Sequence, residues 1–411
     1  MKTCLAALIA IAFGWQCVTV RNAQAISTTE VRVDEQNLAG VVPNARIQAY
    51  DLSPDGSRVA LFVVSGDHVP APSSIVTVSV KDSKILGEAS LGSSRQYVQG
   101  YAPQIAFAAN GTLLVVQDGQ TVSVFDSATL AALRTIAPDS ASHFRIPAAI
   151  TTAGEGAVVA ISFGTGAPVI NYMDKRPVHI AIVDVTTGKQ VGGWDANDIP
   201  FSISPNAEYV AISDHSTAGS VMGVAILDAK SGNELITLSG GFPNRAGGYP
   251  SGKGAFNGQF WTRIIAKFVG DDEIALTPDG NKDQSGRDIG ASLKIVRFKG
   301  AQTIQDIVPE KYGPTGEIAV STDRNTLVAI SRYIEPRFLT HHLPIPTDSK
   351  TELLVFSKHR IFELEIRKKL SPLLTLRTRG PFDTAEVRIS ADGLVISVAE
   401  NYGVTIFSGN E

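Results

Sequence analysis

The stretch Ser53-Pro54-Asp55-Gly56-Ser57-Arg58-Val59-Ala60-Leu61-Phe62-Val63-Val64 places a tight turn directly before a strand. Pro54 fixes φ near the value that a β-turn needs, and Gly56 can adopt a left-handed conformation. The run from Arg58 to Val64 is apolar, rich in β-branched residues and too short for a helix. These residues predict two antiparallel strands joined by the turn at residues 53–56.

Related turns recur along the chain, and each precedes a short strand rich in Val, Ile, Leu and Ala. They stand at Ala109–Gly111, Gly154–Gly156, Ser204–Asn206, Gly270–Asp272, Thr322–Arg324 and Ser390–Gly393. From Asp55 to Asp392 the unit repeats about every 56 residues. A propeller blade of four strands takes roughly 40–45 residues, so each unit has the length of one blade plus a loop.

A third strand follows each second strand, and several third strands end in a hairpin signal. The clearest signals are residues 184–189, Asp-Val-Thr-Thr-Gly-Lys, and residues 228–233, Asp-Ala-Lys-Ser-Gly-Asn. Seven units of four strands at a regular spacing favour radial repetition over two packed sheets. We therefore expect an all-β chain in which residues 26–411 form a single seven-bladed β-propeller of four-stranded antiparallel blades.

The last unit ends so close to the end of the sequence that its fourth strand has no room there. Thr29–Val33 is predicted to supply this strand, which would close the ring with both ends of the chain and remove an open edge. In the sixth unit two segments compete for the outer strand, Ile361–Ile366 and Leu373–Leu376.

The turns and strands quoted above resemble those of the WD40-like and quinoprotein-like β-propeller families, over nearly the whole of residues 26–411. The resemblance implies a propeller architecture. It implies no particular ligand and no particular reaction.

The first 25 residues have the pattern of an export signal. Lys2 is followed by the apolar run Cys4–Val20 and by Ala23-Gln24-Ala25, a small-residue site after which a signal peptidase cuts. An uncleaved membrane anchor is the alternative to cleavage. We expect an exported protein, periplasmic or extracellular, that starts at Ile26. Because Cys4 and Cys17 both precede the cut, the mature chain would hold no disulfide and no thiolate metal site.

The net charge and the hydropathy of the chain argue against nucleic acid as a partner and against a membrane span after the signal. The chain has 36 basic and 40 acidic residues, for a formal net charge of −4. This balance argues against nucleic acid as the main partner. No second apolar run approaches the length of a membrane span, and we expect a soluble monomer after the signal.

Linear motifs for catalysis or metal binding are incomplete. Residues 247–254, Gly-Gly-Tyr-Pro-Ser-Gly-Lys-Gly, fall one residue short of a phosphate-binding loop. Asp214-His215-Ser216 has the residue types of a hydrolase triad, but three consecutive residues do not line up as one. Asp279, Asn281 and Asp283 alternate as calcium ligands do and predict a calcium site, and no other cofactor is expected. A basic run from Lys358 to Arg379 is interpreted as a solvated outer strand, with an anionic surface as the alternative ligand.

Chain direction predicts where a partner binds. In a four-stranded meander, the first-to-second and third-to-fourth turns lie on one face, and the other connections lie on the opposite face. Long insertions are expected almost entirely on the second face, including residues 65–74, 164–177, 278–292 and 333–350. We call this predicted surface the loop-rich face. Its candidate binding residues are Tyr97, Tyr101, Asp174, Arg176, His215, Arg245, Tyr249, Lys253, Arg337 and His342.

The predicted propeller and its loop-rich face are compatible with two classes of function. The first is a non-catalytic binding or scaffolding module that holds a protein, small molecule or glycan on the loop-rich face. The alternative is a propeller enzyme, a lactonase-like hydrolase or a lyase, with catalytic residues contributed by several blades. Such residues leave no linear motif, so the sequence alone leaves both classes open.

Overall fold

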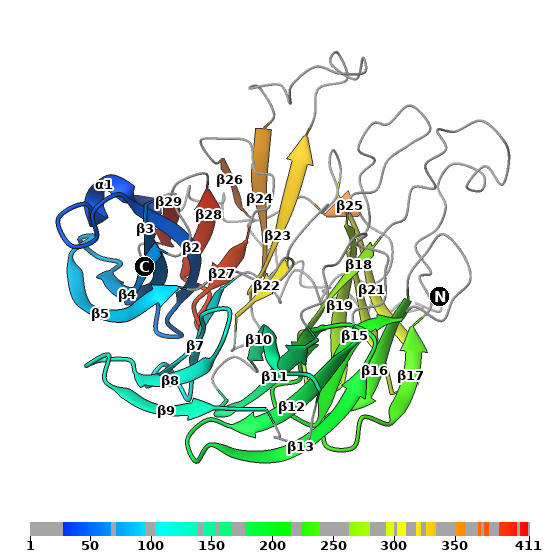
Figure 1. Cartoon of the computed structure of the whole chain (residues 1–411). Helices are drawn as coiled ribbons and strands as arrows, with labels where there is room; N and C mark the ends of the chain where they lie inside the picture. Colours follow the sequence, from blue (N-terminus) through cyan, green and yellow to red (C-terminus); the bar gives the residue numbers. More distant parts are fainter. Residues whose placement is uncertain are drawn as a thin grey trace, which may run out of the picture.

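The computed structural model is an all-β ring of sheets (Figure 1). It describes residues 28–66, 71–94, 103–138, 143–152, 156–165, 177–214, 223–238, 263–279, 293–299, 302–309, 318–321, 326–333, 350–357, 369–370, 374–377, 386–400 and 403–409. These residues form seven sheets, and each consists mainly of four antiparallel strands that follow one another in the chain. The predicted all-β propeller with four-stranded antiparallel blades is confirmed.

The first four sheets each take four consecutive strands. The first contains β2 (Ala45–Leu52), β3 (Arg58–Ser65), β4 (Ala71–Ser79) and β5 (Ile85–Ser94). The second contains β6 (Gln104–Ala108), β7 (Leu113–Gln117), β8 (Val122–Asp126) and β9 (Ala132–Ile136). The third contains β10 (Ile146–Thr152), β11 (Val158–Gly164), β12 (Val178–Asp184) and β13 (Lys189–Ala196). The fourth contains β14 (Pro200–Ile203), β15 (Tyr209–Asp214), β16 (Gly223–Asp228) and β17 (Glu234–Leu238).

The remaining three sheets each depart in part from that plan. The fifth contains β18 (Arg263–Phe268), β19 (Glu273–Asp279), β20 (Leu293–Arg297), β21 (Gln302–Pro309) and the added β25 (Lys369–Leu370). The sixth contains β22 (Ile318–Val320), β23 (Thr326–Tyr333), β24 (Lys350–Ser357) and β26 (Leu374–Arg377). The last contains β27 (Val387–Ile389), β28 (Val395–Glu400), β29 (Gly403–Gly409) and β1 (Thr28–Asp34).

The first strand of each sheet faces the centre of the ring. Strand β2 contacts β6, and the contacts continue in order through β10, β14, β18, β22 and β27, which returns to β2. The apolar core is divided accordingly, with one cluster at each junction of neighbouring sheets. Phe62 of the first sheet packs with Leu114 of the second, and Ile226 of the fourth packs with Phe268 of the fifth. Burial between sheets therefore holds the ring together.

A buried serine organises the turn between the first and second strands. Ser53 Oγ accepts the backbone N–H of Arg58 at 2.9 Å, and its hydroxyl donates to Asp55. Ser390 repeats this arrangement with Val395 N–H and Asp392, and both serines are fully buried. Ser204 accepts the N–H of Tyr209 in the same position. The turn pattern seen in the sequence is thus a hydrogen-bonded unit.

An aspartate organises the turn between the third and fourth strands. Asp126 accepts the backbone N–H of Thr129 at 2.8 Å and the Thr129 hydroxyl, and these bonds lower the pKa of Asp126. Asp228 accepts the hydroxyl and N–H of Ser231 in the same way, which lowers its pKa. Gly232 follows with a φ of 71°, a left-handed conformation that suits glycine. These bonds fix the hairpin geometry that the sequence signals.

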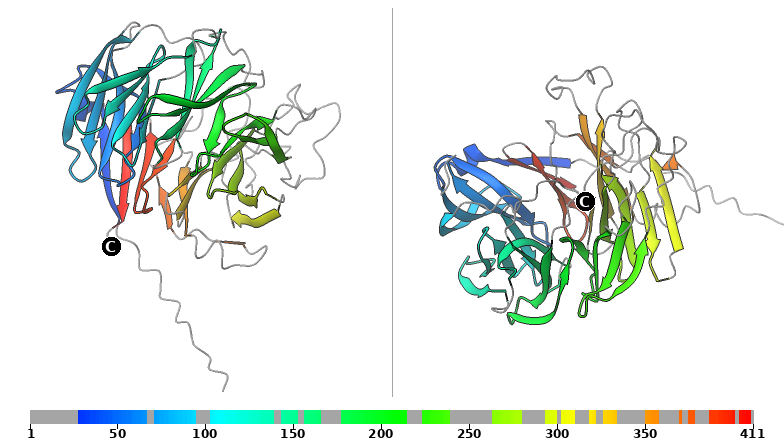
Figure 2. Two further views of the ribbon diagram at one scale, coloured as in Figure 1. Left: turned by 90° about the horizontal axis from the view of Figure 1, so that it is seen from below. Right: turned by 45° about the vertical axis from the view of Figure 1, so that its right-hand side comes forward.

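Strand β1 completes the last sheet, as predicted for Thr29–Val33. It pairs antiparallel with β29 from Thr28 opposite Gly409 to Asp34 opposite Gly403. Val33 is fully buried in the cluster that joins the last sheet to the first. Asp34 then caps the short helix α1 (Glu35–Leu38), which leads into β2. Figure 2 shows β1 and β29 side by side at the rim of the ring.

The structure selects one of two predicted strands in the sixth sheet. It also contains one pairing that was not predicted and contradicts one predicted loop. In the sixth sheet the outer strand is β26, which pairs with β24 and selects the Leu373–Leu376 alternative. Strand β25 adds in parallel to β21, a pairing for which we found no sequence signal. The expected insertion at residues 65–74 is wrong for Ala71–Ser74, because β4 begins at Ala71 and pairs with β3 and β5.

The connections between strands differ between the two faces. First-to-second turns are short throughout, as at residues 53–57 and 269–272. Third-to-fourth turns are also short, except that residues 358–373 separate β24 from β26. The longer connections, such as 165–177, 239–262, 280–292 and 334–349, belong to the opposite set. Among the described residues, no helix is long and apolar enough to cross a membrane.

Candidate functional site

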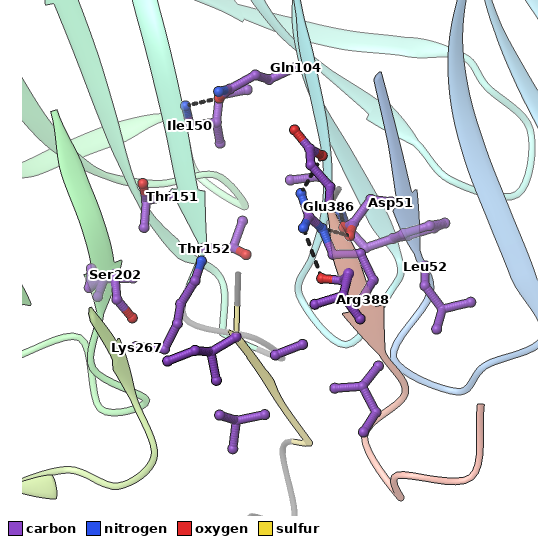
Figure 3. Close-up of a pocket in the computed structure, with 18 of the residues that line it drawn as sticks. Asp51, Leu52, Gln104, Ile150, Thr151, Thr152, Ser202, Lys267, Glu386 and Arg388 are labelled. Atoms are coloured by element: carbon purple, nitrogen blue, oxygen red, sulfur yellow. Dashed lines mark hydrogen bonds and ion pairs between the residues drawn. The ribbon is translucent and has the colours of Figure 1, made fainter. Parts of the chain in front are cut away.

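A cavity of about 540 Å³ lies at the centre of the ring. Its lining comes from β2, β6, β10, β14, β18, β22 and β27, the first strands of the sheets. The turn residues Pro54 and Pro205 also line it, so it extends to the face with the short turns. The charged side chains that the described lining contributes are Asp51, Lys267, Glu386 and Arg388 (Figure 3).

Three of these charged residues form one group where the last sheet meets the first. Arg388 Nε donates to Asp51 Oδ1 at 3.1 Å, and Arg388 Nη2 donates to Glu386 Oε2 at 3.0 Å. The Arg388 guanidinium also lies 5.6 Å from the centre of the Tyr50 ring. The Tyr50 hydroxyl donates to the carbonyl oxygen of Glu386 at 2.7 Å. We call Asp51, Glu386 and Arg388 the acidic group, because it contains two carboxylates and one guanidinium.

Asp51 is the most buried member of the acidic group. Burial raises the pKa of its carboxyl, and the positive charge of Arg388 opposes that increase. Asp51 Oδ2 accepts the backbone N–H of Phe107 at 2.7 Å, while Oδ1 accepts from Arg388. Because both oxygens accept N–H groups, the carboxylate form fits this site at neutral pH.

Polar side chains of the first strands also bridge to the next sheet around the ring. Asp51 accepts from Phe107 in β6, and Gln104 Oε1 accepts the N–H of Ile150 in β10 at 2.6 Å. Thr151 Oγ1 donates to the carbonyl oxygen of Pro200 at 3.3 Å, and Ser202 Oγ accepts the N–H of Phe268 at 3.1 Å. These bonds satisfy backbone groups at the inner edges of the sheets. They also fix the positions of the side chains that surround the cavity.

Lys267 lies across the cavity from the acidic group (Figure 3). It comes from β18, next to β14 with Ser202. Thr151 and Thr152 of β10 lie near the same side in Figure 3. The charged side chains of the described lining therefore lie on two sides of the cavity, Lys267 on one and the acidic group on the other.

The candidate binding residues named from the sequence lie elsewhere in the chain. Tyr97, Tyr101, Asp174, Arg176, His215, Arg245, Tyr249, Lys253, Arg337 and His342 all lie outside the described residues. Asn281 and Asp283 of the calcium proposal lie outside them as well, while Asp279 ends β19, paired with Arg263. Within the described ranges, no group of three His, Cys, Asp or Glu residues could hold a metal ion.

Sequence reasoning missed the cavity residues, although a signal for them exists. Asp51, Ser202 and Arg388 each precede a buried turn serine by two residues, at Ser53, Ser204 and Ser390. Residues two apart in a strand point to the same face. Lys267 precedes Val269 by two, and Val269 N–H bonds to Glu273 where Ser53 N–H bonds to Arg58. If the repeated units are aligned on their first-to-second turns, Asp51, Ser202, Lys267 and Arg388 occupy the same position in the alignment.

Comparisons with known proteins support the architecture. No protein-family model matches the chain, and no curated protein matches it in sequence. Hydrazine synthase of Kuenenia stuttgartiensis has a similar structure, with a TM-score of 0.54 and 17% identity over 90% of this chain and 96% of that chain. The C-terminal WD40 domain of Sif2 matches with a TM-score of 0.49 and 11% identity, over 94% of this chain and 99% of that domain. At 17% identity, the likeness to hydrazine synthase shows the β-propeller fold alone.

Proposed function

We propose that this protein is an exported, seven-bladed β-propeller, closed by β1, that acts as a non-catalytic binding module. Its partner, a protein, small molecule or glycan, contacts the loop-rich face near the ring axis. Seven sheets among the described residues and the closed series of contacts from β2 to β27 support the blade count. The pairing of β1 with β29 supports closure by the N-terminal strand.

The uneven distribution of strand connections carries the binding proposal. First-to-second turns such as residues 53–57 are short and held by internal hydrogen bonds. The long connections 239–262, 280–292 and 334–349 all join strands at the other set of strand ends. Loops on a rigid scaffold are where binding groups concentrate, and tyrosine and arginine are frequent anchors of interfaces. Neutral insertions into individual loops would be expected at both sets of strand ends, so they do not explain why most long connections occur at one set.

The test compares variants on the two faces. Arg176→Ala, Arg245→Ala and Arg337→Ala change the loop-rich face one residue at a time. Lys189→Ala and Asn233→Ala change exposed residues at the third-to-fourth connections of the opposite face. We expect capture of partners from the native extracellular fraction to fall for the first set alone. Equal capture by both sets of folded variants would contradict the proposal.

Export is tested by the mass of the mature product. Cleavage after Ala25 yields a chain that begins at Ile26 and contains no thiol. Mass spectrometry of the intact exported protein should find this species. A product that retains Cys17 would contradict the proposed cleavage.

A propeller enzyme is the second candidate, favoured by the position of Asp51. A carboxyl of raised pKa beside a cavity is a common feature of catalytic sites. Measuring divalent metal in the purified protein distinguishes the candidates, because lactonase-like chemistry across several blades would be metal-dependent. Calcium at Asp279, Asn281 and Asp283 is tested by melting with excess chelator, which lowers Tm if the ion stabilises the fold.

A further inference from the structure

Three polar side chains of the central cavity have hydrogen-bonding groups that the described part of the chain does not use. Ser202 Oγ accepts the N–H of Phe268 at 3.1 Å, and its hydroxyl hydrogen has no acceptor among the described residues. Gln104 Oε1 accepts the N–H of Ile150 at 2.6 Å, and the amide hydrogens of Gln104 have no described acceptor. Glu386 Oε2 accepts from Arg388 at 3.0 Å, while its Oε1 accepts from no described donor. The cavity therefore offers both donors and an acceptor to a ligand.

Ser202 is the most informative of these side chains, because it is only 7% exposed. A buried hydroxyl group costs free energy unless its donor as well as its acceptor finds a partner. Ser202 lines the cavity, where a ligand oxygen could accept its hydrogen (Figure 3). It comes from β14, whereas Gln104 of β6 and Glu386 of β27 come from the two neighbours of β2, toward the opposite side of the ring. A ligand that bonds to all of them must therefore extend across the cavity.

The combination of donors and acceptor selects the chemistry of the ligand. A carboxylate could accept from Ser202 and Gln104, but it would meet a charge of the same sign at Glu386. An ammonium group could pair with Glu386, but it has no lone pair to accept from Ser202 or Gln104. A hydroxyl group both donates and accepts. Several hydroxyls on one carbon chain therefore satisfy all of these groups without burying an unpaired charge.

We propose that the central cavity binds a neutral polyhydroxyl compound, a sugar or sugar alcohol. One of its hydroxyls accepts from Ser202, a second accepts from the Gln104 amide, and a third donates to Glu386 Oε1. The volume of about 540 Å³ falls within the roughly 300–1,000 Å³ of small-molecule sites. This site goes beyond the proposed partner binding, because it is built from the first strands of the sheets and uses no residue of the loop-rich face.

The binding experiment titrates the full mature chain with sorbitol, glucose and 1,6-hexanediol in a calorimeter. Sorbitol and 1,6-hexanediol share a chain length, but sorbitol carries a hydroxyl on every carbon, and glucose presents the same chemistry as a ring. We expect sorbitol or glucose to bind at least about tenfold more tightly than 1,6-hexanediol. Gluconate and glucosamine, which add a negative and a positive charge, should bind more weakly than the neutral compounds. Titration is preferred to thermal melting because polyols also stabilise proteins by exclusion from their surface.

Two variants change the ligand-binding group of a residue and keep the bond that it already makes. Gln104→Glu keeps an acceptor for the N–H of β10 but removes the amide donors, and Glu386→Gln keeps an acceptor for the guanidinium but replaces the other oxygen by a donor. Each should lower the affinity for the better of sorbitol and glucose about tenfold. Gln190→Glu and Glu234→Gln make the same changes at exposed positions of β13 and β17 and should have no effect. Ser202→Ala replaces either cavity variant if thermal melting shows that it does not fold.

Three outcomes would overturn the proposal. They are the absence of saturable binding by both sorbitol and glucose, equal affinity for 1,6-hexanediol, and unchanged affinity in the folded cavity variants. The first would mean that the cavity holds water alone. None of these results bears on the arginine variants of the loop-rich face. Failure of the polyhydroxyl site and failure of the proposed partner binding are therefore distinguishable.

Discussion

The first and last sheets are built from the same parts but are assembled differently. In the first sheet, β2 to β5 follow one another from Ala45 to Ser94. In the last, β27 to β29 come from the end of the chain and β1 from near its beginning. Both use the buried-serine turn, at Ser53 and Ser390. The comparison shows that local sequence specifies a blade, whereas joining the ends of the ring depends on contacts between residues far apart in the chain.

Of the tests that follow, deleting residues 26–33 should lower the free energy of unfolding the most. The deletion removes most of β1, exposes the edge of β29 and takes Val33 out of the core. Burial of Val33 alone contributes about 1.5–3 kcal/mol, so the free energy of unfolding should fall by more than that. Denaturant unfolding measures the change, with removal of residues 410–411 as the control. An unchanged midpoint would show that β1 does not close the ring.

Arg388→Ala breaks the ion pair between the last sheet and the first. It leaves the Asp51 carboxylate buried with one backbone donor, which should cost about 3 kcal/mol of unfolding free energy. We take the lower end of the usual range because 30% of the Arg388 side chain is exposed.

Arg58→Ala is the matched comparison at a junction where the chain is continuous. Arg58 donates to the carbonyl oxygens of Ser127 and Gly111 in the second sheet, so its loss should cost about 1–2 kcal/mol. Chemical denaturation of both variants measures the difference. A larger loss for Arg58→Ala would mean that the closing junction is no more sensitive than the others.

Ser53→Ala and Ser390→Ala test whether the buried-serine turn contributes equally to the free energy of unfolding in the two sheets. Each serine accepts a backbone N–H at 2.9 Å, so each loss should cost about 1–3 kcal/mol, with similar values in the two sheets. Thermal unfolding of the two single variants makes the comparison. A difference much above 1 kcal/mol would show that the strand from the other end of the chain alters local turn stability.

The pH dependence of Asp51 should give the smallest effect. Because burial raises its folded-state pKa above the unfolded value, Asp51 binds its proton more tightly in the folded state. Its contribution to the free energy of unfolding therefore rises as pH falls through the folded pKa toward about 4, the unfolded value. Asp55, Asp126 and Asp228, with lowered pKa values, act in the opposite direction. Subtracting the pH profile of Asp51→Asn isolates the effect, and identical profiles would contradict it.

The architecture could be predicted because its signals are local and repeated. The turn at Ser53-Pro54-Asp55-Gly56 and the hairpin at Asp228–Asn233 determine strand ends through hydrogen bonds within a few residues. The strand β25 carries no such signal, because a two-residue pairing depends on where distant chain segments meet. Residues 71–74 are predicted as part of a loop because their sequence, Ala-Pro-Ser-Ser, lacks the apolar and polar alternation of a typical strand. In the structure Ser73 donates to Gly92 and Ser74 to Glu88.

The candidate site was harder to predict than the fold. The sequence reasoning looked for function in long insertions, whereas the described cavity residues sit inside short strands. Asp51 and Arg388 meet across most of the length of the chain, and nothing in either local sequence indicates the other. The calcium site at Asp279, Asn281 and Asp283 stays a prediction, because only Asp279, at the end of β19, lies among the described residues. Chemistry assembled from several sheets becomes visible only after the repeats are placed in register.

Because β1 pairs with β29, the two ends of the chain meet in one sheet, and the same ring could be built from a chain opened at a different connection. Thr28 lies opposite Gly409, so the described ends leave the last sheet side by side (Figure 2). A short linker can join them, and new ends can be opened in an exposed turn such as residues 230–232. Such a circular permutant would keep every strand pairing while making the composite sheet continuous.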